Sequence, residues 1–185
     1  DIDLQDDVTT TGFQTYLAAG TIFLGNAGGA STYTATGTGA NDAITFDGNT
    51  VLNGHTVVDQ QGGDDADDVI FDGSVLADAT GNERTLEITV AGNGDLTVAG
   101  DIGGDPNAAP SGTALDSLVV NSADVATFQN VLTQADAGGV GIDVTANTIR
   151  LNGDLATTEV AVAGDATLTG ALVLDVDGVD ISTNS

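Results

Sequence analysis

Short runs of alternating apolar and polar residues dominate the chain, and each run ends at Gly, Asn or Asp. A period of two places successive side chains on opposite faces of a β-strand, while Gly, Asn and Asp are typical of the turns between strands. The pattern therefore predicts an all-β protein built from short strands. The predicted strands are residues 2–4, 21–24, 44–46, 69–71, 86–90, 96–98, 118–120, 142–144, 148–151, 160–162, 166–168 and 172–176.

Helical periodicity is almost absent, because apolar residues do not recur at i, i+3, i+4 and i+7 over any long window. The best helical candidate is residues 123–134, where Val125, Phe128, Val131 and Leu132 are suitably spaced. The same segment is equally compatible with an irregular strand, so both interpretations stay open.

Several phrases recur along the chain, and internal repeats are typical of solenoid folds. Residues 2–11 align without gaps on residues 149–158, an offset of 147 positions from Ile2 to Ile149. This match predicts that the C-terminal stretch begins the N-terminal pattern again, within a longer repetitive protein or a unit that stacks end to end. The other recurring phrases are ITFDG (44–48) with VIFDG (69–73), LNG (52–54 and 151–153) and VAG-x-x-x-L (90–96 and 162–168).

The repeats divide the chain into eight segments of 18 to 29 residues, which begin at positions 1, 21, 44, 69, 95, 124, 147 and 165. Segments of this length fit one turn of a parallel β-solenoid, in which each strand pairs with its equivalent one coil away. We therefore expect a single domain over residues 1–185 with about eight coils, and residues 103–113 as its longest corner loop. The competing fold is an antiparallel β-sandwich of a polymerising filament subunit, which also has many short strands. The repeats and the scarcity of two-residue hairpin turns favour the solenoid.

Charge narrows the range of partners, because 28 Asp and Glu residues face only 2 Lys and Arg residues, for a net charge of −26. Such a chain cannot neutralise nucleic-acid phosphates, and anionic lipid repels it. The absence of Cys excludes disulfides and thiolate metal sites, and a single His leaves little room for zinc or Ser-His-Asp chemistry. The hydrophobic fraction of 41% argues against disorder.

The setting predicted from composition is the exterior of a bacterial or archaeal cell. An acidic surface without Cys fits an extracellular or cell-surface location. The chain begins at Asp1 and contains no Met, so we expect a processed or excised segment, with any export signal outside it. No run of 18 apolar residues occurs, and we expect no membrane insertion.

The phrases also carry a resemblance to a known class of proteins. The chain resembles the repeat regions of large bacterial secreted proteins of the filamentous-haemagglutinin and autotransporter-adhesin type, over most of its length. This resemblance implies a right-handed parallel β-helix in an extracellular fibre, adhesin or matrix protein, without catalytic residues. The phrases are DVTTTG (7–12), ITFDG (44–48), ITVAGNGDLTVAGDIGG (88–104), LDSLVVNSA (115–123) and TIRLNGDL (148–155).

Clustered aspartates make calcium the expected cofactor, because hard oxygen ligands on a flexible loop suit Ca²⁺. The repulsion within a chain of charge −26 supplies a physical motive, since bound cations would screen it. The alternative is a solvated acidic surface without specific ions. The candidate ligands are Asp64, Asp65, Asp67 and Asp68 in GGDDADDV, Asp175, Asp177 and Asp180 in LDVDGVD, and Asp6 and Asp7.

The function predicted from these features is structural. We expect a subunit or repeat segment of an extracellular filament, adhesin stalk or biofilm matrix that self-associates, with Ile2, Leu4, Val176 and Ile181 buried at the junctions. An alternative is a carbohydrate- or receptor-binding adhesin module that contacts a cell-surface glycan or other matrix components. A third reading, an enzyme, would have only Arg84 and Arg150 as cationic groups, and Asp is common in turns for conformational reasons. We therefore predict no enzymatic activity.

Overall fold

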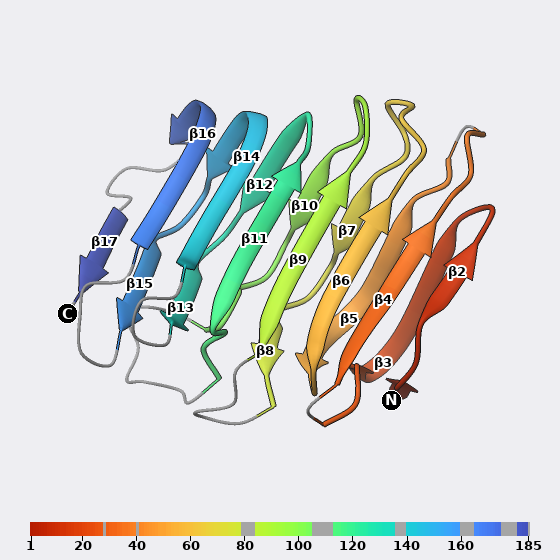
Figure 1. Ribbon diagram of the computed structural model, residues 1–185, viewed down its shortest axis with the longest axis horizontal. Helices are drawn as coiled ribbons and strands as arrows, with labels where there is room; N and C mark the ends of the chain where they lie inside the picture. The colour runs from red at the N-terminus through yellow and green to blue at the C-terminus, as the bar shows by residue number, and fades with distance from the viewer. Residues whose placement is uncertain are drawn as a thin grey trace.

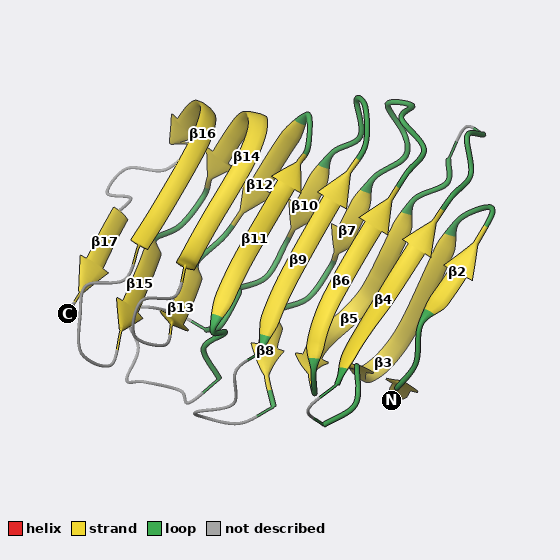
Figure 2. Cartoon of the chain, viewed as in Figure 1, coloured by secondary structure: helices red, strands yellow, loops and turns green. Residues whose placement is uncertain are grey.

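The computed structural model describes residues 1–27, 29–39, 41–78, 84–104, 113–135, 140–159, 165–174 and 181–184, which form strands and turns but no helix (Figure 2). Consequently no described segment is a helix long and apolar enough to cross a membrane. The strands are β1 (Ile2–Leu4), β2 (Val8–Thr10), β3 (Gln14–Leu24), β4 (Ala30–Ala35), β5 (Ile44–Leu52), β6 (His55–Gln60), β7 (Val69–Phe71), β8 (Val75–Ala77), β9 (Thr85–Val90), β10 (Leu96–Val98), β11 (Ser117–Ser122), β12 (Val125–Phe128), β13 (Val131–Ala135), β14 (Val140–Leu151), β15 (Leu155–Glu159), β16 (Asp165–Leu174) and β17 (Ile181–Asn184).

The strands form three stacks, which the chain visits in turn, and we call one layer of a stack a rung (Figure 1). Stack A contains β2, β4, β6, β9, β11 and the first halves of β14 and β16. Stack B contains the first halves of β3 and β5, then β7, β10, β12 and the second halves of β14 and β16. Stack C contains β1, the second halves of β3 and β5, then β8, Ile102, β13, β15 and β17.

The stacks are joined wherever a strand continues around a corner. Strands β3 and β5 run from stack B into stack C, and β14 and β16 run from stack A into stack B. For this reason fourteen strands form one strongly curled sheet, beside a three-stranded sheet of β13, β15 and β17. Every pairing between these strands is parallel, which contradicts the antiparallel β-sandwich and is consistent with a solenoid-like fold.

Alternation along each strand builds the core, because parallel pairing in register places equivalent residues of successive rungs in one interior column. In stack A, Tyr33, Val58, Ile88, Val120 and Val144 form such a column, and each is at most 1% exposed. Stack B contributes a second column with Ile44, Val69, Leu96, Ala126 and Ile149, all fully buried. Burial of apolar surface is worth about 25 cal/mol per Å², so these columns supply the main stabilising term.

The recurring phrases differ in their structural meaning. ITFDG and VIFDG are stacked neighbours, since Ile44 pairs with Val69 and Phe46 pairs with Phe71. In contrast, Ile2 lies in stack C and Ile149 lies in stack B. The alignment of the two ends is therefore not an equivalence of position in the fold, and the prediction that the N-terminal pattern restarts at residue 149 is wrong.

Most predicted strands are present, and the helical candidate is not. Residues 123–134 form a turn, β12 and the start of β13, because Ala126, Phe128 and Val131 alternate into the interior. Several strands were not predicted, notably β2, β4 and β6, whose Thr, Ser, His and Gln residues mask the alternation. Predicted strand 160–162, residues 175–176 of the last predicted strand and positions 105–112 of the predicted corner loop lie outside the described residues.

Candidate functional site

The aspartates proposed as calcium ligands do not come together at one place. Asp64, Asp65, Asp67 and Asp68 lie in the turn between β6 and β7, at the corner between stacks A and B. Asp6 and Asp7 lie at a different corner, between β1 and β2. Asp175, Asp177 and Asp180 are outside the described residues.

Asp67 is fully buried and closes the turn in which it lies. Its Oδ1 accepts a hydrogen bond of 2.9 Å from the backbone N–H of Asp42, and its Oδ2 accepts bonds of 2.9 Å from the N–H groups of Gly63 and Asp64. Burial by itself would raise the pKa of Asp67, but the N–H donors of Asp42, Asp64 and Gly63 outweigh it and hold the pKa below its usual value. The carboxylate therefore holds the backbone of two successive rungs together.

Three further aspartates form a row along the same corner, which we call the corner ladder: Asp68, Asp95 and Asp124. The N–H of Asp95 donates to Asp68 Oδ1 at 2.8 Å, and the N–H of Val125 donates to Asp95 Oδ1 at 3.0 Å. The side-chain amide of Asn147 donates to Asp124 Oδ1 at 2.8 Å. Each carboxylate thus accepts a hydrogen bond from the next rung.

The corner ladder concentrates negative charge. Burial raises the pKa of Asp95, the N–H of Val125 opposes that effect, and the charges of Asp68, Asp124 and Asp65 raise the pKa further, so the net direction is upward. The phrase GGDDADDV did not point to Asp95 and Asp124. A sequence signal was present nonetheless, since each ladder aspartate directly precedes a strand of stack B or its first apolar residue.

The same bridging between rungs occurs at other corners. Side-chain oxygens of Asp1, Asp7, Asn49 and Asn130 accept hydrogen bonds from backbone N–H groups that are 20 to 25 positions further along the chain. These bonds are 2.7 to 3.2 Å long. Much of the acidic composition therefore has a structural use, because a corner Asp or Asn satisfies a backbone donor that the strands leave over.

Metal binding has no preformed centre in the described part of the chain. No group of three or more His, Asp or Glu side chains there is arranged to hold an ion. Asp64 and Asp65 are exposed, whereas Asp67 is engaged with three backbone donors. Calcium binding stays a prediction.

The two arginines and the single histidine of the chain lie among the described residues, on stacks A and B. Arg84 is 7% exposed and binds Asp78 through two contacts, Nε to Oδ1 and Nη2 to Oδ2, both of 2.9 Å. Arg150 is exposed on the outer side of stack B. His55 Nδ1 lies 2.8 Å from Thr85 Oγ1, on strands β6 and β9, which follow one another in stack A.

The two ends of the stacks leave interior columns partly uncovered. Leu172 and Leu174 are 45% and 51% exposed, although the residues with which they pair, Ile149 and Leu151, are fully buried. At the opposite end, Ile2, Leu4, Val8 and Tyr16 are only partly buried. Val176 lies outside the described residues, and so does the side chain of Ile181, so the predicted junction is only partly visible.

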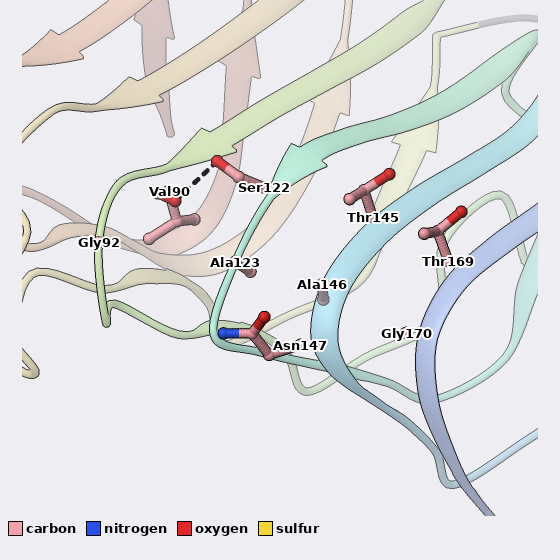
Figure 3. A pocket seen from close by; sticks show the side chains of 9 residues that line it. All are labelled: Val90, Gly92, Ser122, Ala123, Thr145, Ala146, Asn147, Thr169 and Gly170. Carbon is pink, nitrogen blue, oxygen red and sulfur yellow. Dashed lines mark hydrogen bonds between the residues drawn. The ribbon is translucent and has the colours of Figure 1, made fainter.

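One pocket of about 420 Å³ opens at the corner between stacks A and B, near the last rungs (Figure 3). Its lining contains no charged side chain. Thr145 and Thr169 lie side by side along it, and Ser122 donates a hydrogen bond of 2.9 Å to the carbonyl oxygen of Val90. We call this pocket the corner groove, and its lining is Val90, Gly92, Ser122, Ala123, Thr145, Ala146, Asn147, Thr169 and Gly170.

Comparison with known proteins adds no relative to this description. No protein-family model, no curated protein and no solved structure gives a significant match to the chain.

Proposed function

We propose that the chain is a structural subunit or repeat segment of an extracellular filament, adhesin stalk or biofilm matrix, and that it stacks end to end. The observation that carries the proposal is the exposure of Leu172 and Leu174, compared with complete burial of Ile149 and Leu151 one rung earlier. A further rung would bury these leucines as the preceding rungs bury theirs. Among the described strands β16 pairs only with β14, and an open strand edge favours such an addition.

The proposed architecture is a right-handed parallel β-solenoid of about eight coils. The number of rungs in stack C supports eight coils. These rungs are, in order, β1, β3, β5, β8, Ile102, β13, β15 and β17. The handedness rests on the general preference of parallel crossover connections, about 98% of which are right-handed.

The interior columns provide a register for the stacking. If β16 of one copy pairs with β2 and the start of β3 of the next, Leu168 meets Val8 in stack A. In stack B, Leu172 meets Gln14 and Leu174 meets Tyr16. Leu168 with Val8, and Leu174 with Tyr16, then continue two interior columns across the junction, whereas Leu172 meets the polar Gln14. Gln14 is already satisfied, since its Nε2 donates to Thr34 O at 2.6 Å and its Oε1 accepts from the Tyr16 hydroxyl at 2.8 Å.

Charge is the main obstacle to stacking, and we propose that cations reduce it. Each copy carries a net charge of −26, so two copies repel each other at low ionic strength. Calcium at the exposed carboxylates of Asp64 and Asp65, close to the corner ladder, would lower the repulsion locally. A saline exterior would lower it diffusely.

Sedimentation equilibrium on the purified chain tests the proposal. We expect association that strengthens with protein concentration and with salt or Ca²⁺. The double variant Leu172→Asp and Leu174→Asp places charge in the uncovered columns and should leave a monomer. Leu17→Asp is the matched control, because Leu17 is 69% exposed on a strand at the opposite end but points away from the interior.

Two results would contradict the proposal. One is a monomeric wild-type chain at high concentration with Ca²⁺, together with a parent gene that holds no tandem array. The other is association that the paired leucine substitutions leave unchanged, while circular dichroism confirms that the variant is folded.

A further inference from the structure

The corner groove exists because successive corners differ in length. Residues 91–95 make a separate turn between β9 and β10, which stands out from the corner. In the later rungs β14 and β16 continue around the same corner without a break, at Ala146 and Gly170. Figure 3 shows Gly92 at one end of the groove and Thr169 and Gly170 at the other, so the groove extends toward the last rung.

Phe13 is an exposed aromatic residue at the same corner of the opposite end. It lies between β2 of stack A and β3 of stack B, and it is 68% exposed. Within the first rung it directly precedes Gln14, just as Ala171 directly precedes Leu172 in the last described rung of stack B. Aromatic side chains usually bury about 150–250 Å² of surface in a folded protein. The exposed ring of Phe13 does not gain the favourable free energy of that burial in the isolated chain.

We propose that the corner groove receives Phe13 of a second copy of this chain. The inference rests on the end-to-end stacking proposed above and adds a specific contact to it. In the register of the interior columns, Phe13 of the incoming copy lies one rung beyond Ala171, beside Gly170. Rungs are about 4.8 Å apart, a distance that a phenyl ring spans when it points back toward the groove.

The size of the groove suits this occupant. Its volume of about 420 Å³ lies within the range of about 300–1,000 Å³ that is usual for ligand pockets, so one ring fits. Ala123, Ala146 and Gly170 leave space that larger side chains would fill, and the methyl groups of Thr145 and Thr169 offer apolar contacts. The groove can therefore hold one phenyl ring.

The absence of charged side chains from the lining of the groove also favours the pairing. Like charges that face each other across an interface cost energy, so a contact between two chains of net charge −26 is most favourable between uncharged residues. All nine residues that line the groove are uncharged, and so are Thr11, Gly12 and Phe13 of the incoming corner. The contact thus lies on uncharged residues, although the corner ladder adjoins the groove, where the side-chain amide of Asn147 donates a hydrogen bond to Asp124 Oδ1 at 2.8 Å.

A complementation experiment tests the contact directly. Phe13→Ser removes the phenyl ring, and Thr169→Phe fills the groove from within its own copy; each should raise the dissociation constant for self-association about tenfold or more. A mixture of these two variants retains one intact groove and one intact phenyl ring, so it should form a heterodimer with the wild-type dissociation constant. Leu17→Ser removes an apolar side chain of similar exposure from the same rung and should have no effect.

A fluorescence experiment reports on the ring itself. The chain contains no Trp, so Phe13→Trp introduces a single indole. Its emission should shift to shorter wavelength as the protein concentration rises, and Thr169→Phe in the same chain should abolish the shift. An unshifted emission in an associated sample would overturn the proposal.

The outcomes separate this inference from the stacking on which it rests. A monomeric wild type overturns the contact of Phe13 between copies, and together with a parent gene that holds no tandem array it overturns the stacking as well. Association that the paired Leu172 and Leu174 substitutions abolish, but that Phe13→Ser and Thr169→Phe leave intact, supports stacking and overturns the contact of Phe13. If maltose, as a neutral saccharide, raises the melting temperature of the wild type and Thr169→Phe removes the effect while Phe13→Ser still associates, the groove is a carbohydrate site and the inference is wrong.

Discussion

The backbone N–H of Asp42 donates a hydrogen bond of 2.9 Å to the carboxylate of Asp67, which lies 25 positions further along the chain and is fully buried. The bond joins two successive rungs at the corner between stacks A and B. It shows how a strongly acidic chain uses part of its charge within the fold. Asp67, which the sequence suggested as an ion ligand, instead accepts hydrogen bonds from backbone N–H groups.

Asp67→Asn should destabilise the protein by roughly 1–3 kcal/mol. Asparagine keeps only one acceptor oxygen, and its –NH₂ group cannot accept, so at least one buried backbone donor loses its partner. Either amide orientation loses at least one of the bonds from Asp42, Gly63 and Asp64. Urea unfolding at pH 7 measures the loss. Asp65→Asn is the matched control, since Asp65 is exposed in the same turn, and its unfolding midpoint should not fall.

The pH dependence of the same carboxylate has a definite sign. The pKa of Asp67 is lower in the folded protein than the ordinary aspartate value of about 3.9. Its contribution to stability is therefore present above that value and is lost as pH falls through the folded pKa. Melting temperatures from pH 6 to pH 2 should show a steeper decline below pH 4 for the wild type than for Asp67→Asn; equal slopes would contradict the assignment.

Asp95→Asn should have the opposite effect at neutral pH. The pKa of Asp95 is raised, so its charged form costs stability above the folded pKa, and that cost disappears as pH falls through it. Asparagine retains an oxygen for the N–H of Val125 and removes the repulsion from Asp68 and Asp124. We expect a higher melting temperature than wild type at pH 7 in low salt and a smaller difference at high salt. A lower melting temperature in low salt would show that the charge is stabilising.

Phe46→Ala should destabilise the fold by about 3–5 kcal/mol, because it opens a cavity in a stacked aromatic row. Phe46 lies between Tyr16 and Phe71, with ring centroids 5.2 and 4.7 Å away and nearly parallel planes. Chemical denaturation measures the change. Phe13→Ala deletes the same ring from an exposed position and should cost the monomer little. Equal losses for the two variants would mean that the row is not the core of these rungs.

Calcium should raise the melting temperature if exposed corner carboxylates bind it. An ion present at about 100 times its dissociation constant stabilises the folded state by about 2.7 kcal/mol. Thermal melts in EDTA, in CaCl₂ and in NaCl of equal ionic strength separate specific binding from screening. Asp64→Asn with Asp65→Asn should weaken the response to CaCl₂ but not to NaCl. An identical melting temperature in EDTA and CaCl₂ would exclude the proposal.

Local sequence determined a large part of the secondary structure. The alternation of Ile44, Thr45 and Phe46 predicted a strand with two inward side chains, and the similar phrase at Val69 and Phe71 predicted its stacked neighbour. Strands such as β6 escaped prediction, because Thr56 and Gln60 occupy interior positions where apolar residues are expected. Hydrophobic patterning cannot identify a polar residue that points into the interior, because such a residue is buried only by its neighbours in the rungs on either side.

The composition and the alternating pattern of this chain, by themselves, determined that it is acidic and all-β, and they predict that it does not bind nucleic acid. The tertiary structure decided which distant residues meet. Asp68, Asp95 and Asp124 become neighbours only because parallel strands stack in register, and the position of Ile2 in stack C rather than in stack B follows from the lengths of the intervening corners. The corner groove has the same origin, because it reflects a difference between corners several rungs apart. Such relationships depend on how many residues each turn contains before the next strand pairs, and a local pattern of apolar and polar residues does not record that count.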